Sequence, residues 1–126
     1  MFDAVAREDL EDLIAASHPD IELVSAMAPA EGGVPYCGHD GVRQWWANTF
    51  ATWDDYRLEP IRLLDLEPYV LGVFRVAGRG KTSGAPMERR IFLCIELDGG
   101  TVRRIFAAFE LPLALRELAS WIETGA

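Results

Sequence analysis

Side chains that could transfer a proton or orient a ligand are spread through the middle of the chain. Glu88 and Arg90 are two residues apart, so they share one face if this segment is a strand. If that face lines a cavity, an acid beside an arginine can orient a water molecule or a polar substrate. If the face meets a partner subunit instead, the same two side chains form an ordinary ion pair. The sequence leaves both interpretations open.

A histidine and two tyrosines extend this set. His39 stands next to Asp40, and such a pair can act as a proton shuttle where it reaches a pocket. The alternative is that Asp40 caps a helix and His39 is a loop residue. Tyr36 and Tyr56 can each donate a hydrogen bond to a ligand carbonyl or to a structural partner. The candidates for catalysis are therefore Glu88, His39 and Tyr36.

An aromatic helix must position several of these groups. From Tyr36 to Trp53 the larger side chains follow one helical face, namely Val42, Trp45, Trp46, Thr49, Phe50 and Trp53. Three indoles on a short helix are buried against a sheet or line a cavity. The expected ligand-binding residues are Trp46, Trp53, Tyr56 and Arg90. The spacing alone does not decide whether Trp45 or Trp46 points inward.

The remaining elements follow from apolar periodicity and from turn residues. Asp9 is expected to cap a short helix, His18-Pro19-Asp20 to end it, and Asp40 to cap the aromatic helix. The glycines after Asp98 predict a hairpin. The predicted strands cover residues 21–27, 57–66, 69–78, 87–97 and 101–109, and a last helix covers 113–122.

The third of the four long strands predicts that both faces of the sheet are covered. One face is uniformly apolar, with Ile91, Leu93, Ile95 and Leu97. The other face is mixed rather than polar, with Glu88, Arg90, Phe92, Cys94 and Glu96. A sheet with one wet face alternates cleanly between apolar and polar residues. We therefore expect helices on one face and a partner subunit on the other, which predicts a homodimer through the sheet face.

The length and the net charge of the chain limit the classes of protein to which it can belong. The 126 residues predict one domain, 1–126, and the net charge of −8 argues against a nucleic-acid partner. The arginines in the middle of the chain form cross-strand ion pairs or attract an anionic ligand. No apolar run predicts a membrane span, and no signal-peptide pattern opens the chain, so a cytoplasmic location is expected. Two isolated cysteines and two histidines predict neither a metal site nor another cofactor.

The order of these elements resembles the SnoaL-like proteins of the nuclear transport factor 2-like superfamily. The residues that carry the resemblance are 9–11, 18–20, the Tyr-x-Gly loop and helix start at 36–46, 78–84, 98–100 and 114–115. The resemblance implies an α+β, cystatin-like fold. In it, N-terminal helices pack on the concave face of a strongly curved, cone-shaped antiparallel sheet, and a short helix ends the chain.

The resemblance also implies two functions. One is a cofactor-independent acid/base isomerase, cyclase or hydratase that acts on a hydrophobic carbonyl-bearing or polycyclic substrate. The steroid isomerases of the superfamily have their base in a register that falls on Ser25 and a tyrosine in one that falls on Met1, so two of their groups are missing here. The alternative is a non-catalytic ligand-binding or dimerisation module. Both functions predict a pocket for a small hydrophobic molecule.

Overall fold

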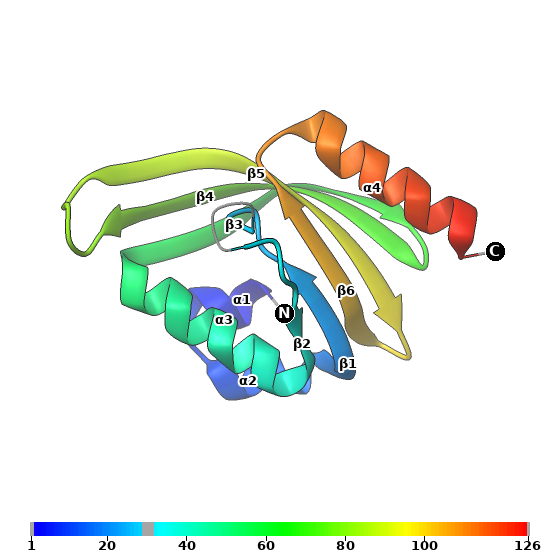
Figure 1. Cartoon of the computed structure of the whole chain (residues 1–126), viewed down its shortest axis with the longest axis horizontal. Coiled ribbons are helices and arrows are strands. Elements are labelled where there is room, and N and C mark those ends of the chain that lie inside the picture. Colours follow the sequence, from blue (N-terminus) through cyan, green and yellow to red (C-terminus); the bar gives the residue numbers. More distant parts are fainter. Residues whose placement is uncertain (1, 29–31, 126) are drawn as a thin grey trace.

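A curved sheet with helices on both faces forms the fold of the computed structural model, which describes residues 2–28 and 32–125. The elements in chain order are α1 (Phe2–Ala6), α2 (Leu10–Ala15), β1 (Ser17–Val24), β2 (Tyr36–Cys37), α3 (Gly38–Thr52), β3 (Trp53–Leu66), β4 (Tyr69–Gly80), β5 (Pro86–Asp98), β6 (Thr101–Ala108) and α4 (Leu111–Thr124). The predicted α+β class is confirmed (Figure 1).

The sheet has the strand order β2-β1-β6-β5-β4-β3. The four long strands β3 to β6 pair antiparallel with their neighbours in sequence, as predicted. The turn between β5 and β6 contains Gly99 at φ 60° and Gly100 at φ 84°, which are conformations that side chains with a Cβ rarely adopt. The eight-residue β1 then adds to β6 in parallel, and the two-residue β2 pairs antiparallel with β1.

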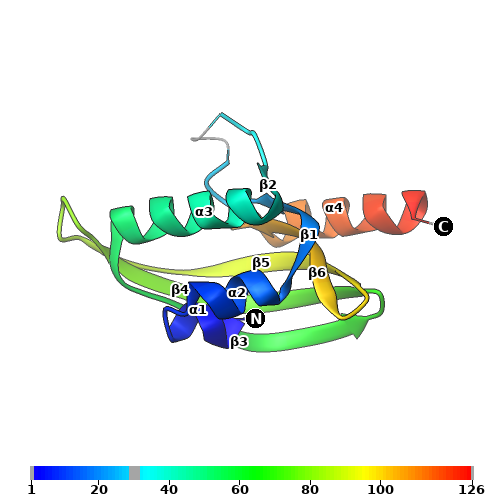
Figure 2. The ribbon, with the colours of Figure 1, turned by 90° about the horizontal axis from the view of Figure 1, so that it is seen from below.

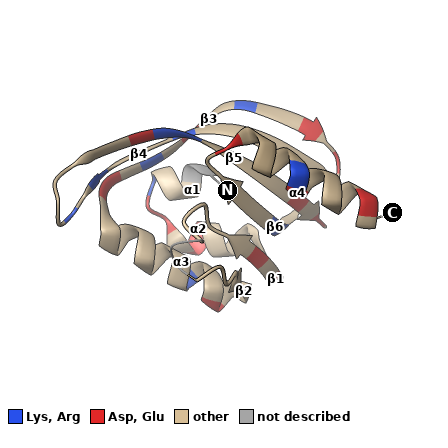
Figure 3. Cartoon of the chain, turned by 45° about the horizontal axis from the view of Figure 1, so that its top comes forward, with Lys and Arg blue, Asp and Glu red and all other residues tan. Residues whose placement is uncertain are grey.

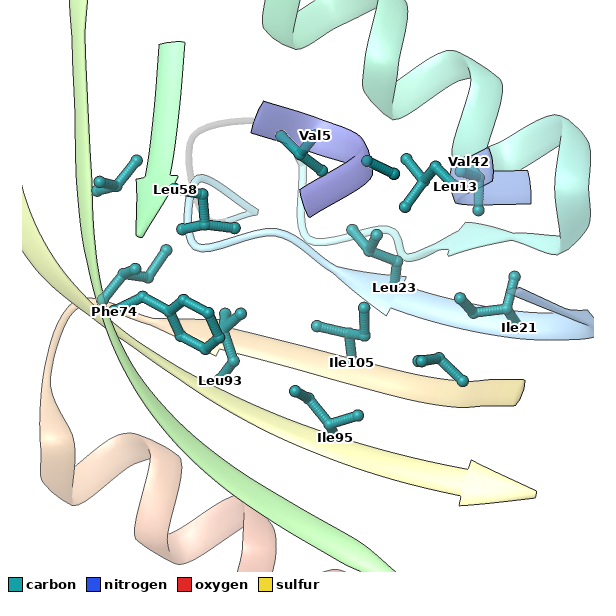
Figure 4. Close-up of a cluster of buried hydrophobic side chains, with 14 of the residues drawn as sticks. Val5, Leu13, Ile21, Leu23, Val42, Leu58, Phe74, Leu93, Ile95 and Ile105 are labelled. Atoms are coloured by element: carbon teal, nitrogen blue, oxygen red, sulfur yellow. The ribbon is translucent and has the colours of Figure 1, made fainter. Parts of the chain in front are cut away.

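Helices α1, α2 and α3 cover one face of the sheet, which we call the inner face (Figures 1 and 2). Phe74 on β4 and Ile91, Leu93 and Ile95 on β5 belong to this face, and all four are buried. Figure 4 shows side chains from the helices and from the strands, such as Leu13 and Leu93, pointing into the same space. Burial of this apolar surface provides the main driving force for packing the helices against the sheet.

The opposite, outer face is covered in part by α4 of the same chain. Ala114, Leu118 and Trp121 of this helix pack with Cys94 of β5, and Phe92 lies against the same cluster. The Cys94 thiol donates a hydrogen bond to the Ala114 carbonyl oxygen at 3.0 Å, and burial raises the pKa of this thiol to about 11. The helix α4 therefore accounts for the apolar residues that the sequence pattern had assigned to a subunit interface.

In the N-terminal segment the cap at Asp9 is as predicted, whereas β1 covers Ser17–Val24 rather than the predicted residues 21–27. Asp9 caps α2, because its carboxylate accepts a hydrogen bond from the Asp12 amide at 3.1 Å. Pro19 lies within β1 rather than in a break before it. The pairing of β1 with β6 is irregular between Ser17 and Glu22, so a residue without an amide hydrogen is accommodated there.

The aromatic helix begins earlier than predicted. Cys37 of β2 occupies the N-cap position and the helix starts at Gly38, so Asp40 lies inside the first turn. The Asp40 carboxylate accepts a hydrogen bond from the Arg43 guanidinium at 3.0 Å. The predicted cap at Asp40 is wrong, because β2 leads directly into the helix.

The junction of β2 and α3 allows no side chain at Gly41. A Cβ there would lie 2.7 Å from the carbonyl carbon of Tyr36. Replacing glycine by alanine inside a helix normally stabilises it by about 1 kcal/mol. We expect Gly41→Ala instead to lower the free energy of unfolding by about 1–3 kcal/mol, because the backbone must shift. Urea denaturation followed by circular dichroism measures this change, and a more stable variant would contradict the close approach.

Candidate functional site

A cavity of about 290 Å³ lies between the inner face of the sheet and the three N-terminal helices. Its walls are mainly aliphatic and aromatic. The helices contribute Val5, Leu13, Val42, Trp45 and Thr49, the segment after β1 contributes Ser25, Ala26 and Met27, and the remaining lining residues come from the strands and the residue after β6. Figure 4 shows Val5, Leu13 and Leu58 on separate elements around this space. The volume is just below the ~300–1,000 Å³ typical of small-molecule sites.

The pleat of β5 decides which of its side chains reach the cavity. Met87, Arg89, Ile91 and Leu93 alternate along the strand and all line the cavity. Residues at even positions of this stretch, such as Arg90, face the outer side, because successive side chains of a strand point to opposite faces. This geometry decides the question that the sequence left open, namely which strand face lines the pocket.

Two of the three indoles of the aromatic segment line the cavity. They belong to Trp45 and Trp53. Trp46 packs on Phe50, with ring centroids 4.5 Å apart, and is not among the lining residues. Trp45 makes an edge contact with Tyr56 at 6.4 Å between centroids. Of the predicted pocket walls, Trp53 and Tyr56 therefore lie in the cavity, whereas Trp46 supports it from outside.

Tyr56 brings a hydroxyl group into this apolar space. No hydrogen bond joins that hydroxyl to any described residue in 2–28 or 32–125. Burial raises the pKa of Tyr56 to about 12. At neutral pH the phenol therefore stays protonated, and it can donate a hydrogen bond to a ligand in the cavity.

Arg89 is a lining residue that the sequence analysis did not select. Its guanidinium lies over the ring of Phe109, 4.0 Å from the centroid, and the side chain is exposed at the edge of the cavity. Among the described residues, no carboxylate is within ion-pair distance of it. The signal was present in the sequence, because Arg89 shares the face of Ile91 and Leu93 by strand alternation.

Ser25 also reaches the cavity, in the region where the family's steroid isomerases are expected to hold their base. Its hydroxyl oxygen accepts a hydrogen bond from the Met27 amide at 3.1 Å. A serine hydroxyl is too weak a base to remove a carbon-bound proton unaided. Met1, the register of the second isomerase group, lies outside the described residues.

Glu88 and Arg90, which the sequence offered as site residues, lie on the outer face. The Glu88 carboxylate accepts a hydrogen bond from the Arg75 guanidinium at 2.8 Å, and Arg75 also contacts Glu59 at 3.2 Å. All of these groups are largely open to solvent, and acidic and basic segments follow one another along this part of β4 and β5 (Figure 3). The structure thus places Glu88 in a surface ion-pair network, away from the cavity.

His39 and Tyr36 join β2 and α3 to their neighbours rather than line the cavity. The Nε2 atom of His39 is 2.8 Å from the carbonyl oxygen of Ser17. The Tyr36 hydroxyl accepts a hydrogen bond from the Asn48 side-chain amide at 3.0 Å. Neither residue is part of the lining. The structure therefore does not bring the three expected catalytic residues, Glu88, His39 and Tyr36, together.

Neither a metal-binding cluster nor a membrane-spanning helix is found in the described part of the chain. Within it, no three histidine, cysteine, aspartate or glutamate side chains gather closely enough to hold a metal ion. None of the helices within residues 2–28 and 32–125 combines the length and apolar character needed to cross a bilayer.

Solved structures with the same fold have little sequence in common with this chain. A nuclear transport factor 2-like protein of unknown function from Burkholderia pseudomallei superposes with a TM-score of 0.76 at 19% identity, covering 91% of this chain and 88% of the other. The protein TerC, co-crystallised with polyporic acid, gives 0.76 at 20% identity and covers 94% and 92%. A proposed polyketide cyclase from Xanthomonas campestris gives 0.75 at 13% identity and covers 93% and 90%.

The sequence comparisons identify a family. No curated protein matches the chain significantly. The model of the SnoaL-like domain, in contrast, matches residues 1–105. This match includes all three N-terminal helices and most of the sheet that together enclose the cavity. The chain therefore belongs to the SnoaL-like family, with the nuclear transport factor 2-like fold.

Proposed function

We propose that this protein binds a small, largely apolar molecule in the cavity between α1–α3 and the sheet. The observation that carries the proposal is the chemistry of the described lining: aliphatic and aromatic walls, with polar groups on Ser25, Thr49, Tyr56 and Arg89. Tyr56 and Arg89 donate hydrogen bonds and are poor proton acceptors at neutral pH. Such a lining suits recognition of a carbonyl-bearing or acidic molecule better than abstraction of a proton.

An acid/base enzyme is the second candidate. The hydroxyl of Tyr56 supports it, because a phenol in a water-poor site can polarise a ligand carbonyl. A fold shared with a proposed polyketide cyclase adds support for an isomerase, cyclase or hydratase. Such a reaction also needs a proton acceptor, and Glu88 and His39 do not line the cavity. We therefore favour binding without proton transfer.

Filling the cavity tests the proposal directly. Ala107 lines the cavity on β6, whereas Ala47 is exposed on α3. We expect 2-acetylnaphthalene, a neutral aromatic ketone, to bind the wild type and the control variant Ala47→Phe equally in isothermal titration calorimetry. Ala107→Phe should reduce the affinity at least tenfold, since the added ring occupies the ligand's space. Absence of binding to the wild type, or equal binding to all three proteins, would overturn the proposal.

The variant Tyr56→Phe tests whether the Tyr56 hydroxyl contacts a ligand or has a structural partner. Because no described residue hydrogen-bonds with it, we expect Tyr56→Phe to change the free energy of unfolding at pH 7 by less than ~0.5 kcal/mol. The pKa of Tyr56 is raised in the folded state from 10.0 to about 12. Its contribution to stability is complete below pH 10 and is lost as the pH rises towards 12, by about 2–3 kcal/mol in total.

Urea denaturation between pH 7 and pH 11 measures this effect. The stability of the wild type should fall more steeply above pH 10 than that of Tyr56→Phe. Cys94 also has a raised pKa, but it is present in both proteins and cancels from their difference. Parallel pH profiles would mean that the hydroxyl is open to solvent rather than buried in the cavity, and a large loss of stability of Tyr56→Phe at pH 7 would mean that the hydroxyl has a structural partner.

We also propose that two copies associate through the outer face. The helix α4 covers only part of it, and Leu64 and Leu66 of β3 remain exposed beside that helix, in register with Leu71 and Tyr69. We expect light scattering after gel filtration to report a dimer for the wild type and a monomer for the variant Leu64→Glu/Leu66→Glu. A monomeric wild type would refute this proposal. The cytoplasmic location stays a prediction from the sequence.

A further inference from the structure

We infer that the molecule bound in the cavity is an aromatic or polycyclic acid whose anionic group pairs with Arg89. This inference rests on the proposed function and specifies its ligand class. Arg89 is the charged side chain of the described lining, and its guanidinium stands at the exposed edge of the cavity. An apolar molecule that enters the cavity would leave an anionic group at its outer end beside this cation.

The arginines that serve the structure have a different environment. Arg75 contacts both Glu59 and Glu88, and Arg104 lies 2.8 Å from Glu96. Arg89, in contrast, has no acidic partner among the described residues. An arginine beside an apolar wall with no carboxylate partner retains its capacity to bind an anion through two parallel hydrogen bonds. The N–H groups of Arg89 are therefore free to donate hydrogen bonds to an anion, whereas those of Arg75 and Arg104 already contact carboxylates.

Phe109 orients this guanidinium. The ring lies 4.0 Å from the Arg89 Cζ atom, so one flat side of the guanidinium is covered. A cation over an aromatic face is held by the ring's quadrupole, and the N–H groups at its rim stay available. The stacking thus orients the donors in advance of binding and lowers the entropic cost of capturing an anion.

The register of the sheet places Arg89 and Tyr56 on two strands that are separated by β4. Val76 of β4 pairs with Arg89 on one side and with Leu58 of β3 on the other. Tyr56 is the next residue of β3 on the inner face. With strands ~4.8 Å apart and a rise of ~3.4 Å per residue, the Cα atoms of Arg89 and Tyr56 are about 12 Å apart. Both residues line the same cavity, so a single ligand can contact both of them.

Because the protein as a whole is acidic, binding of an anion depends on the positive charge of Arg89. The protein carries a net charge of −8, so its general field repels anions. Binding of an acid therefore depends on the local guanidinium rather than on a broad basic surface. Removing that one charge is expected to affect anions strongly and neutral molecules little.

A matched pair of probes tests the inference. 2-Naphthoate and 2-naphthamide have the same rings and nearly the same shape, and they differ by one negative charge. In isothermal titration calorimetry at pH 7 and low salt, we expect the wild type to bind 2-naphthoate at least tenfold more tightly than 2-naphthamide. Arg89→Gln should remove this preference by weakening 2-naphthoate about tenfold, with 2-naphthamide changed less than twofold. Arg89→Lys should retain part of the preference.

Arg90→Gln is the control, because Arg90 is the next residue of the same strand and faces outward. It removes the same charge and should leave both affinities unchanged. Thermal melts establish that each variant is folded. If 2-naphthamide binds the wild type as tightly as 2-naphthoate, or if Arg90→Gln acts like Arg89→Gln, the inference is wrong while the proposed function stands. If neither probe binds the wild type, both fail.

Discussion

The two-residue period of β5 is the constraint on which the site depends. One strand carries an alternating series in which Arg89 and Ile91 face the helices while Glu88 and Arg90 face outward. A shift of one residue in its pairing would exchange these sets and turn Glu88 and Arg90 towards the cavity. The pairing is held by β4 along residues 86–96 of the strand and by β6 along residues 92–98. The chemistry of the cavity is thus fixed by the same hydrogen bonds that hold the sheet.

The curvature of the sheet creates a space that the core residues do not fill. Phe74 and Ile21 are fully buried, whereas Trp53 and Tyr56 at the start of β3 are only partly buried. The helices α1 and α2 have five and six residues and cover little of the sheet. The side chains therefore leave a cavity between the helices and the strands. Arg89 lies at the exposed edge of this cavity, where the hydrophobic interior meets water.

The two faces of the sheet have different structural roles. The inner face holds the cavity, and the outer face holds α4 together with the ion pairs of Arg75. Anchoring α4 through Cys94 and Trp121 stabilises β5 from behind, so the strand that carries Arg89 is supported on both sides. Rigid support of this kind favours a preformed binding site, because little ordering is left to occur when a ligand binds.

Local patterns in the sequence determined the four long strands, the Gly99-Gly100 hairpin, the cap at Asp9 and the apolar face of β5, since each depends on neighbouring residues. Contacts between distant segments decided which face of each strand or helix lines the cavity and which points outward. The same sequence spacing is compatible with Trp45 or Trp46 inside, and with Arg89 or Arg90 at the cavity. Only the packing of α3 and α4 against opposite faces selects between them, because burial is a property of the assembled layers and not of any one strand.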